Sequence, residues 1–331
     1  MQTQMDLNKI PTMVGAVAKE RFQEASTLLE KTSWPLYLVG PSGSGKSLTA
    51  MNLARHYAKK HEVPAYYVQL SPDQTKTTVI GGYRLMAGNL QVVKGTVAKA
   101  MSEGAVVVID EATHTTQEML LMFNSVMDRT SLTYIGDELV YADERFRMIF
   151  CSNDALYAGN VRLPQSFAQR LVAFYFDYPE QEDEQQIARK IAREEYNGDF
   201  DVPDSVVRYI AAYIREVRTP YFPLSARNIA ISLIRLAGVG KQSGETGEYF
   251  TKSQNAEASR RRIAERVLGR APKSNSELVT GEVDEFVKFV SAVGVEKFRE
   301  IIMSACMFHL DVDGAELNRD ALQTKLASKI I

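Results

Sequence analysis

The sequence predicts an α/β fold, with a parallel five-stranded sheet between helices, followed by a region made of helices alone. Short apolar runs alternate with segments of helical periodicity over the first 178 residues, which is the pattern of parallel strands joined by helical crossovers. The first apolar run ends in a glycine-rich loop. Beyond Tyr178-Pro179 the strand-like runs stop and helical patterns dominate.

The elements of the α/β region follow one another in a regular order. Residues 14–31 have helical spacing, and helical spacing resumes at residues 47–60, just after the glycine-rich loop. The run Ala-Val-Val-Val-Ile at residues 105–109 is apolar throughout, as expected of a strand covered on both faces. Strands are expected at residues 35–39, 65–70, 105–109, 147–152 and 172–176.

The chain after residue 178 is predicted to be helical. Helical patterns cover residues 182–192, 205–217, 226–236, 283–293, 295–310 and 321–330. A polar stretch at residues 240–257 separates them, and we expect a mobile loop or linker there. The expected domains are an α/β core at residues 1–178, a helical lid domain at residues 179–240, and a flexible loop with a helical C-terminal extension at residues 241–331.

The composition is that of an ordinary globular protein. Among 331 residues, 39 Lys and Arg oppose 41 Asp and Glu, so the net charge of −2 indicates neither a nucleic-acid nor a membrane partner. The first residues lack the features of a signal peptide, and no apolar run approaches the ~20 residues that span a bilayer. We therefore expect a soluble, cytoplasmic protein whose two distant cysteines, Cys151 and Cys306, are reduced and buried.

The glycine-rich loop fits the pattern G-x4-G-K-[ST] between a strand and a helix. Glycines let successive backbone N–H groups approach a phosphate, and the helix that follows directs its positive end at the anion. Lys46 would bridge the β and γ phosphates of ATP, and Ser47 would offer its hydroxyl to Mg²⁺. The residues predicted to bind the nucleotide are Gly40, Pro41, Ser42, Gly43, Ser44, Gly45, Lys46, Ser47 and Leu48.

Two carboxylates, Asp110 and Glu111, follow the apolar strand at residues 105–109. Asp110 would hold the water shell of Mg²⁺, and Glu111 would orient and deprotonate the attacking water. Many strands end in acidic residues, so this pattern gains its meaning from the phosphate-binding loop upstream. A glutamate beside the magnesium aspartate favours hydrolysis over transfer to a small acceptor, and it predicts an ATPase rather than a kinase.

In their order, these motifs resemble those of the AAA+ ATPases. In that family a polar residue that ends the next strand, sensor 1, helps to position the lytic water, and here it is Asn153; an asparagine in an ordinary turn is the alternative. Residues 163–171, LPQSFAQRL, look like the segment that carries the family's arginine finger. The resemblance implies that Arg170 reaches the γ-phosphate bound by a neighbouring subunit and acts only after assembly.

A second arginine motif lies in the predicted lid. Residues 223–227, PLSAR, are similar to the sensor 2 segment of the same family, in which an arginine contacts the nucleotide. Ser225 would cap the helix, and Arg227 would contact ATP. A solvated surface charge is the alternative interpretation for both Arg170 and Arg227.

Two predicted hairpins narrow the resemblance to the MoxR branch of the family. Residues 81–95 have a turn at Ala87-Gly88-Asn89, and residues 132–141 alternate around Gly136-Asp137. Within that branch, residues 153–159, NDALYAG, and residues 176–179, FDYP, look like the ATPases that activate Rubisco or nitric oxide reductase, the gas-vesicle ATPases and the small ATPase subunit of cobaltochelatase. The family often has Asn-Pro after sensor 1, whereas this chain has Asn153-Asp154, which leaves the subfamily open.

The resemblance implies a homo-oligomeric ring, with six subunits as the family expectation, that remodels or activates a partner protein or metalloenzyme. A protein with a von Willebrand type A domain is among the expected partners. Tyr83, Leu85 and Tyr134 could engage the partner, and packing within the hairpins is the alternative.

A nucleic-acid translocase or loader is the second hypothesis. Only Arg84 and Lys94 are cationic within residues 82–95, few for tracking a phosphate backbone. A non-enzymatic protein whose nucleotide site only stabilises assembly is the third. The basic residues Arg260, Arg261, Arg262 and Arg266 are interpreted as a solvated helix face, with contact to a partner or nucleic acid as the alternative.

Overall fold

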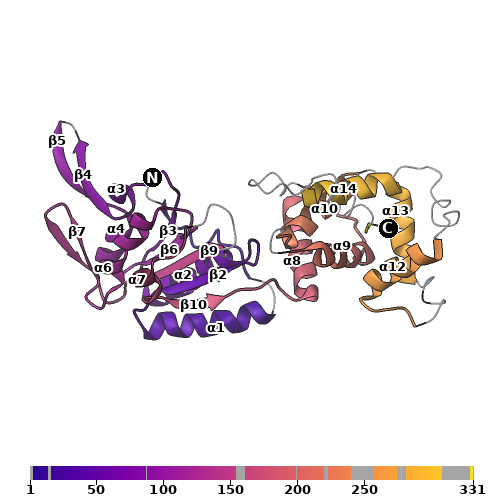
Figure 1. Cartoon of the computed structure of the whole chain (residues 1–331), viewed down its shortest axis with the longest axis horizontal. Coiled ribbons are helices and arrows are strands. Elements are labelled where there is room, and N and C mark those ends of the chain that lie inside the picture. Colours follow the sequence, from indigo (N-terminus) through magenta and orange to yellow (C-terminus); the bar gives the residue numbers. More distant parts are fainter. Residues whose placement is uncertain are drawn as a thin grey trace. The chain divides into compact units, whose positions relative to one another are not determined.

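The computed structural model divides the chain into two compact units, Met1–Tyr178 and Pro179–Ile331 (Figure 1). It describes residues 3–13, 16–86, 88–153, 161–198, 200–219, 223–239, 256–273, 277, 281–307 and 329–330. Among these residues, no helix has the length and apolar character needed to span a bilayer.

The first unit is built on a parallel sheet whose strand order is β1-β3-β6-β9-β2-β10. The five parallel strands are β2 (Leu36–Gly40), β3 (Ala65–Gln69), β6 (Val106–Asp110), β9 (Arg147–Asn153) and β10 (Val172–Tyr175). They confirm the predicted five-stranded parallel sheet. A two-residue strand, β1 (Thr3–Gln4), adds an antiparallel edge to β3 that the sequence did not predict, because two residues carry no periodic pattern.

Helices cover both faces of this sheet. Alternate residues of β6 belong to different cores: Val106 and Val108 pack on the side of α1 (Ala16–Lys31) and α2 (Lys46–His61), whereas Val107 and Ile109 pack on the other side. This division explains why the strand is apolar at every position. The other face is covered by α3 (Lys76–Val79), α4 (Thr96–Glu103), α5 (Gln117–Met122), α6 (Asn124–Met127) and α7 (Gln165–Ala168).

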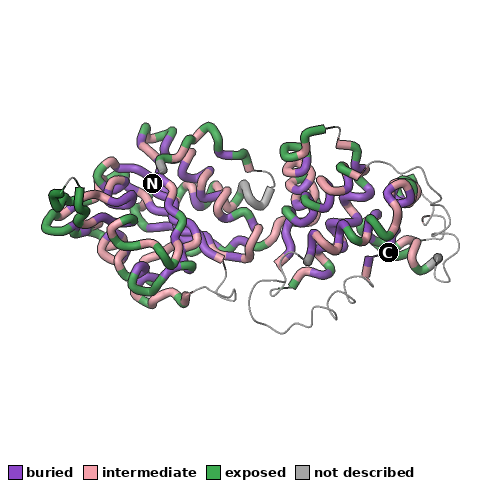
Figure 2. Tube along the Cα trace, turned by 90° about the horizontal axis from the view of Figure 1, so that it is seen from above, coloured by how far each residue is buried: buried purple, intermediate pink, exposed green. Residues whose placement is uncertain are grey.

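Two antiparallel hairpins extend from the first unit, where the sequence predicted them. The first hairpin pairs β4 (Gly81–Met86) with β5 (Asn89–Lys94), and the second pairs β7 (Leu132–Ile135) with β8 (Glu138–Tyr141). Exposed residues dominate the outer part of the first hairpin (Figure 2). Ala87, in the expected turn, lies outside the described residues.

The second unit is helical. Its helices in the described ranges are α8 (Gln181–Glu195), α9 (Asp204–Val217), α10 (Ala226–Gly238), α12 (Ala256–Leu268), α13 (Gly281–Val293) and α14 (Val295–Met307). One apolar core receives residues from all six, so the helices predicted as a lid and those predicted as an extension share a core. Most of the predicted linker at residues 240–257 and of the predicted helix at residues 321–330 lies outside the described residues.

A buried ion-pair group joins two helices of the second unit. The Glu184 carboxylate is fully buried and accepts hydrogen bonds from Arg215, at 3.2 Å, and from Arg218. A buried charge is tolerated when partners of opposite sign replace its hydration, and two guanidinium groups do so here.

Arg266 is buried, so the interpretation of its segment as a solvated helix face is wrong at this position. Its guanidinium lies 5.0 Å from the ring centroid of Tyr209 and 5.2 Å from that of Tyr213, and only 6% of the residue is exposed. It donates hydrogen bonds to the Tyr209 hydroxyl at 2.7 Å and to Glu216 at 2.8 Å. Aromatic rings from α9 therefore make this position a place for a buried cation, which helical spacing alone does not reveal.

Candidate functional site

The glycine-rich loop begins where β2 ends, and its first glycine is required by packing. Gly40 has φ +154°, and a Cβ atom added there would lie 1.9 Å from the carbonyl oxygen of Phe176. Phe176 follows β10 and donates its backbone N–H to Val39 O at 2.7 Å. The chain after β10 thus lies directly against the start of the loop, and only a residue without a side chain fits there.

The loop then delivers the chain to an uncapped helix terminus. Gly45 is the N-cap residue of α2 and, as a glycine, provides no side-chain hydrogen bond to the first backbone N–H groups of α2. The Lys46 ammonium is buried and donates to Pro41 O at 2.7 Å and to Asn153 Oδ1 at 3.2 Å. Uncapped N–H groups beside a lysine form the kind of site that binds a phosphate anion.

Strand register brings the predicted polar residues to one edge of the sheet. Gly40 lies opposite Asn153, and β6 follows β9 in the sheet with Ile109 opposite Phe150. Neighbouring strands are about 4.8 Å apart, so Asp110 lies roughly two strand spacings from the start of the loop. Lys46, Asp110, Glu111 and Asn153 therefore gather at the carboxyl edge of three adjacent strands, as the motifs predicted.

The Asp110 carboxylate is held by two hydrogen bonds. Its Oδ1 accepts the backbone N–H of Glu111 at 3.0 Å, and its Oδ2 accepts the hydroxyl of Tyr67 at 2.8 Å. Burial, and next the Asp110 carboxylate, raise the pKa of Tyr67, so this hydroxyl keeps its proton and remains the donor. Tyr67 was not predicted from the sequence as a site residue, because its partner lies on another strand 43 residues away.

Glu111 has an unusual backbone and environment. Its φ is +53°, a left-handed conformation that costs free energy for a residue with a side chain and is often found at functional sites. Burial, and next the neighbouring Asp110 carboxylate, raise the pKa of Glu111, while His114 and Lys46 oppose the rise. A raised pKa makes a carboxylate a stronger base at neutral pH.

Further hydrogen bonds hold the end of β9. The Tyr37 hydroxyl and Ser152 Oγ are hydrogen-bonded, and Ser152 Oγ donates to the backbone oxygen of Asn153 at 3.1 Å. The Cys151 thiol is buried against the backbone oxygen of Lys46, with a sulfur–oxygen distance of 3.9 Å. Both cysteines are free and buried, which confirms that prediction.

Arg170 lies away from this cluster. Arg170 precedes β10, whose first residue pairs with Leu36 at the start of β2. The glycine-rich loop follows the other end of β2. A strand rises about 3.3 Å per residue, so the length of β2 and β10 separates Arg170 from the loop of its own chain. Its Nε donates to Asp128 at 2.6 Å and its Nη1 to Ser166 O at 2.6 Å.

Arg227 lies in the second unit, at the start of α10, and its side chain is exposed. Ser225 caps that helix as predicted, because its Oγ accepts the Arg227 N–H at 3.3 Å and its own N–H donates to Asn228 Oδ1 at 2.9 Å. Contact of Arg227 with a nucleotide stays a prediction.

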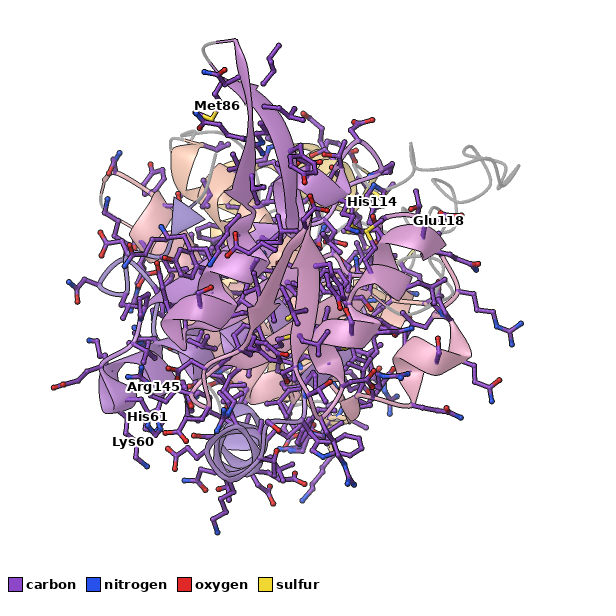
Figure 3. The ribbon with its side chains drawn as sticks, turned by 90° about the vertical axis from the view of Figure 1, so that its left-hand side faces the viewer. Lys60, His61, Met86, His114, Glu118 and Arg145 are labelled. Atoms are coloured by element: carbon purple, nitrogen blue, oxygen red, sulfur yellow. The ribbon has the colours of Figure 1, made fainter. Side chains whose placement is uncertain are left out.

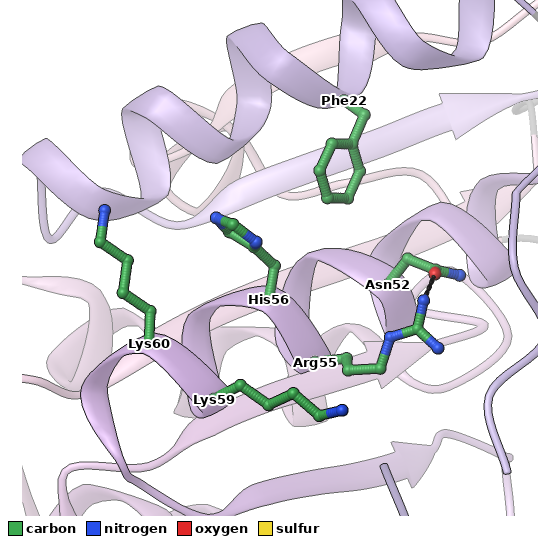
Figure 4. Close-up of a pocket in the computed structure, with 6 residues that line it drawn as sticks. All are labelled: Phe22, Asn52, Arg55, His56, Lys59 and Lys60. Atoms are coloured by element: carbon green, nitrogen blue, oxygen red, sulfur yellow. Dashed lines mark hydrogen bonds between the residues drawn. The ribbon is translucent and has the colours of Figure 1, made fainter. Parts of the chain in front are cut away.

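A shallow basic hollow lies between α1 and α2, farther along α2 than the phosphate loop (Figure 4). Glu30 pairs with Lys60 at 2.7 Å and with His56 at 3.4 Å. Arg55 donates to Ile10 O at 2.8 Å, and Asn52 donates to Pro11 O at 3.0 Å. Several of its polar side chains are thus engaged in holding the N-terminal segment and α1 against α2.

The two hairpins contact each other through a tyrosine and an ion pair. The Tyr83 hydroxyl donates to Asp137 Oδ2 at 2.8 Å, and its ring lies over Gly136, where an added Cβ would come within 2.6 Å of the ring. Lys94 pairs with Glu138 at 3.6 Å. Packing between the hairpins, which was the alternative for Tyr83, thus explains most of the contacts of this side chain. Met86, by contrast, lies near the free end of the first hairpin (Figure 3).

Comparison with known proteins finds similarity over the region that contains this site. Residues 35–171 match the model of the AAA domain, dynein-related subfamily. The gas vesicle ATPase GvpN of Haloferax mediterranei is 28% identical over 206 residues, 56% of this chain and 56% of GvpN. Protein NorQ of Paracoccus denitrificans is 29% identical over 163 residues, 48% of this chain and 57% of NorQ. The chain thus matches little more than half the length of these curated relatives.

Solved structures support the fold. NtrX of Brucella abortus has a TM-score of 0.53 at 16% identity, with 96% of this chain and 69% of that chain covered. A complex of NtrX with ATP has a TM-score of 0.51 at 16% identity, with 97% and 70% covered. These structures show the fold alone, whereas the family model and the two relatives support, over the residues they match, the resemblance to AAA+ ATPases that the motifs indicated.

Gly40→Ala is expected to distort the loop, because the new Cβ would collide with Phe176 O and the φ of Gly40 disfavours a side chain. We expect the free energy of unfolding to fall by about 1–3 kcal/mol, the usual cost of overpacking, and binding of a fluorescent ATP analogue to weaken. Urea unfolding and fluorescence titration measure the two effects. Gly238→Ala is the control, since an added Cβ there meets no atom within 4 Å; equal behaviour of the two variants would contradict the prediction.

Proposed function

We propose that this chain, whose residues 35–171 match the model of the AAA domain of the dynein-related subfamily, binds Mg-ATP at the loop of residues 40–47 and hydrolyses it. The observation that carries the proposal is the convergence of Lys46, Asp110, Glu111 and Asn153 at one sheet edge, beside an uncapped helix N-terminus. A lysine with uncapped N–H groups suits the phosphates, and adjacent carboxylates suit a metal and a water.

The residues present fit a magnesium ion. Ser47 follows Lys46 in the first turn of α2 and has a hydroxyl, and Asp110 has a carboxylate with both oxygens oriented by donors. Oxygen donors of this kind are those that Mg²⁺ prefers. When bound, Mg²⁺ supplies charge that neutralises the β and γ phosphates. Lys46 provides a further positive charge from the chain itself.

Glu111 is the proposed general base. Glu111 is partly buried and follows Asp110 directly, and burial is the main cause that raises its pKa. A base whose pKa lies closer to neutral pH takes a proton from water more readily in the transition state. Asn153, hydrogen-bonded to Lys46, would orient the same water from β9.

Glu111→Gln is expected to lower ATP turnover by about 100-fold or more, the usual effect of losing a general base, and to leave ATP binding unchanged. Phosphate release measures turnover, and titration with a fluorescent ATP analogue measures binding. Glu118→Gln, at an exposed position of α5, is the matched control and should keep full turnover. Turnover that survives Glu111→Gln would contradict the assignment of the base.

Assembly into a homo-oligomeric ring, with six subunits as the expected number, is the second part of the proposal. Arg170 lies at the opposite end of the strands from its own phosphate loop, and Asp128 and Ser166 hold its guanidinium in place. A cation fixed there suits the site of a neighbouring subunit, where a finger supplies charge in the transition state. In the same proposal Arg227 contacts the nucleotide from the helical unit.

A mixing experiment tests the shared site. Arg170→Ala and Glu111→Gln should each be inactive alone, because a finger contributes about 10³-fold or more. When the two variants are mixed, an Arg170→Ala site beside a Glu111→Gln subunit has both its own base and its neighbour's arginine. Random assembly should restore about a quarter of the sites. Arg129→Ala, an exposed neighbour, is the control; a mixture that stays inactive would refute a finger in trans.

Remodelling or activation of a partner protein is the third part. Tyr83 pairs with Val92 and Leu85 with Leu90, so these four side chains share one face of the first hairpin. Leu85 is 74% exposed and Leu90 is 66% exposed, and Tyr134 is exposed on the second hairpin. Exposed apolar faces of this kind suit a polypeptide that presents apolar side chains. A metalloenzyme and a protein with a von Willebrand type A domain are the partner classes that the family resemblance implies.

The apolar face is tested with an unfolded polypeptide, fluorescently labelled carboxymethylated α-lactalbumin. Leu85→Ser with Leu90→Ser should keep ATP turnover and bind this probe about tenfold more weakly, since two exposed apolar side chains are lost. Arg84→Ser with Gln91→Ser alters the opposite face of the same hairpin and should bind the probe normally. Equal loss of probe binding in both double variants would contradict a role of the apolar face. ATP turnover that is stimulated by DNA would favour a nucleic-acid partner instead.

A further inference from the structure

Tyr67 joins the predicted magnesium aspartate to the neighbouring strand. Tyr67 lies on β3 opposite Val108 of β6. Val108 and Asp110 are two residues apart on the same strand, so the side chains of Tyr67 and Asp110 lie on the same face of the sheet. This is the face that packs against α2, the helix that begins at the phosphate loop. The Tyr67 hydroxyl donates to Asp110 Oδ2 at 2.8 Å.

The bond fixes the orientation of the carboxylate. An aspartate side chain can rotate about its terminal bond, and the Glu111 N–H, at 3.0 Å from Oδ1, restrains only one of its two oxygens. The Tyr67 hydroxyl restrains the other from an adjacent strand. With one donor on each oxygen, the plane of the carboxylate is set while lone pairs remain for a metal or its water.

The next residue on the strand gives a comparison within the same structure. Tyr66 points to the opposite face, where its hydroxyl donates to Glu103 Oε2 at 2.6 Å at the end of α4. Both tyrosines lie on β3, each donates a hydrogen bond to a carboxylate, and both are largely shielded from solvent. Only the Tyr67 hydroxyl bonds to a residue of the proposed nucleotide site. The Tyr66 bond to Glu103 lies elsewhere and therefore serves as a structural control.

We infer that Tyr67 is a positioning residue that orients the Asp110 carboxylate for the magnesium ion of the bound nucleotide. The inference rests on the proposed function, because it requires a Mg-nucleotide complex. Partners that orient a metal ligand, without touching the metal, commonly change metal affinity by about 10- to 100-fold when they are removed. The Tyr67 hydroxyl is such a partner for Asp110.

Tyr67→Phe in the full chain tests the inference, with Mn²⁺ as the probe for the metal. Electron paramagnetic resonance measures the affinity of Mn²⁺ for the ADP complex, and a fluorescent ADP analogue in excess chelator measures nucleotide binding without metal. We expect Mn²⁺ affinity to fall about tenfold or more and metal-free ADP binding to stay at the wild-type value. Tyr66→Phe, which also loses one hydroxyl–carboxylate bond, should bind Mn²⁺ as the wild type does.

The outcomes are distinguishable. Wild-type Mn²⁺ affinity in Tyr67→Phe, or equal losses in Tyr66→Phe and Tyr67→Phe, would overturn the positioning role and leave the proposed function standing. A wild-type chain that binds ADP analogue but no Mn²⁺ would overturn the proposed Mg-ATP site, and the inference with it. A tenfold loss confined to Tyr67→Phe, with thermal unfolding temperatures alike in the two variants, would support it.

Discussion

The close passage of the chain after β10 over the start of the phosphate loop is the constraint on which the site depends. Phe176 bonds to Val39, and its carbonyl occupies the space that a side chain at residue 40 would need. This contact lies at the end of β2, where the loop begins. From that point the register with β9 and then β6 places the lysine, the asparagine and the two carboxylates at one edge.

The sequence was sufficient for the parts of the structure that are encoded locally. Apolar runs and a glycine-rich loop predicted the five parallel strands within about a residue at each end, and Gly136-Asp137 predicted the turn of the second hairpin. The glycine-rich loop and the Asp110-Glu111 pair could be singled out for the same reason, since each is a short contiguous pattern to which a physical role can be assigned, and those roles stay predictions.

What the sequence did not reveal depends on contacts between distant segments. Tyr67 is one of two tyrosines in an apolar run, and its hydroxyl has a role only because β6 lies beside β3. Arg266 was interpreted as solvated because helical spacing does not record the rings of Tyr209 and Tyr213 that enclose it. The edge strand β1 is paired only through the backbone, and its two residues carry no pattern.

The contact between Tyr83 and Gly136 gives the two hairpins a mechanical relation. The Tyr83 ring lies on a backbone without a side chain, and its hydroxyl is bonded to the next residue, Asp137. Two-stranded ribbons flex when they are isolated, because nothing supports their faces. Here the second hairpin supports the base of the first, longer hairpin. A force applied at the outer end of the first hairpin would therefore act on β8, the strand that precedes β9.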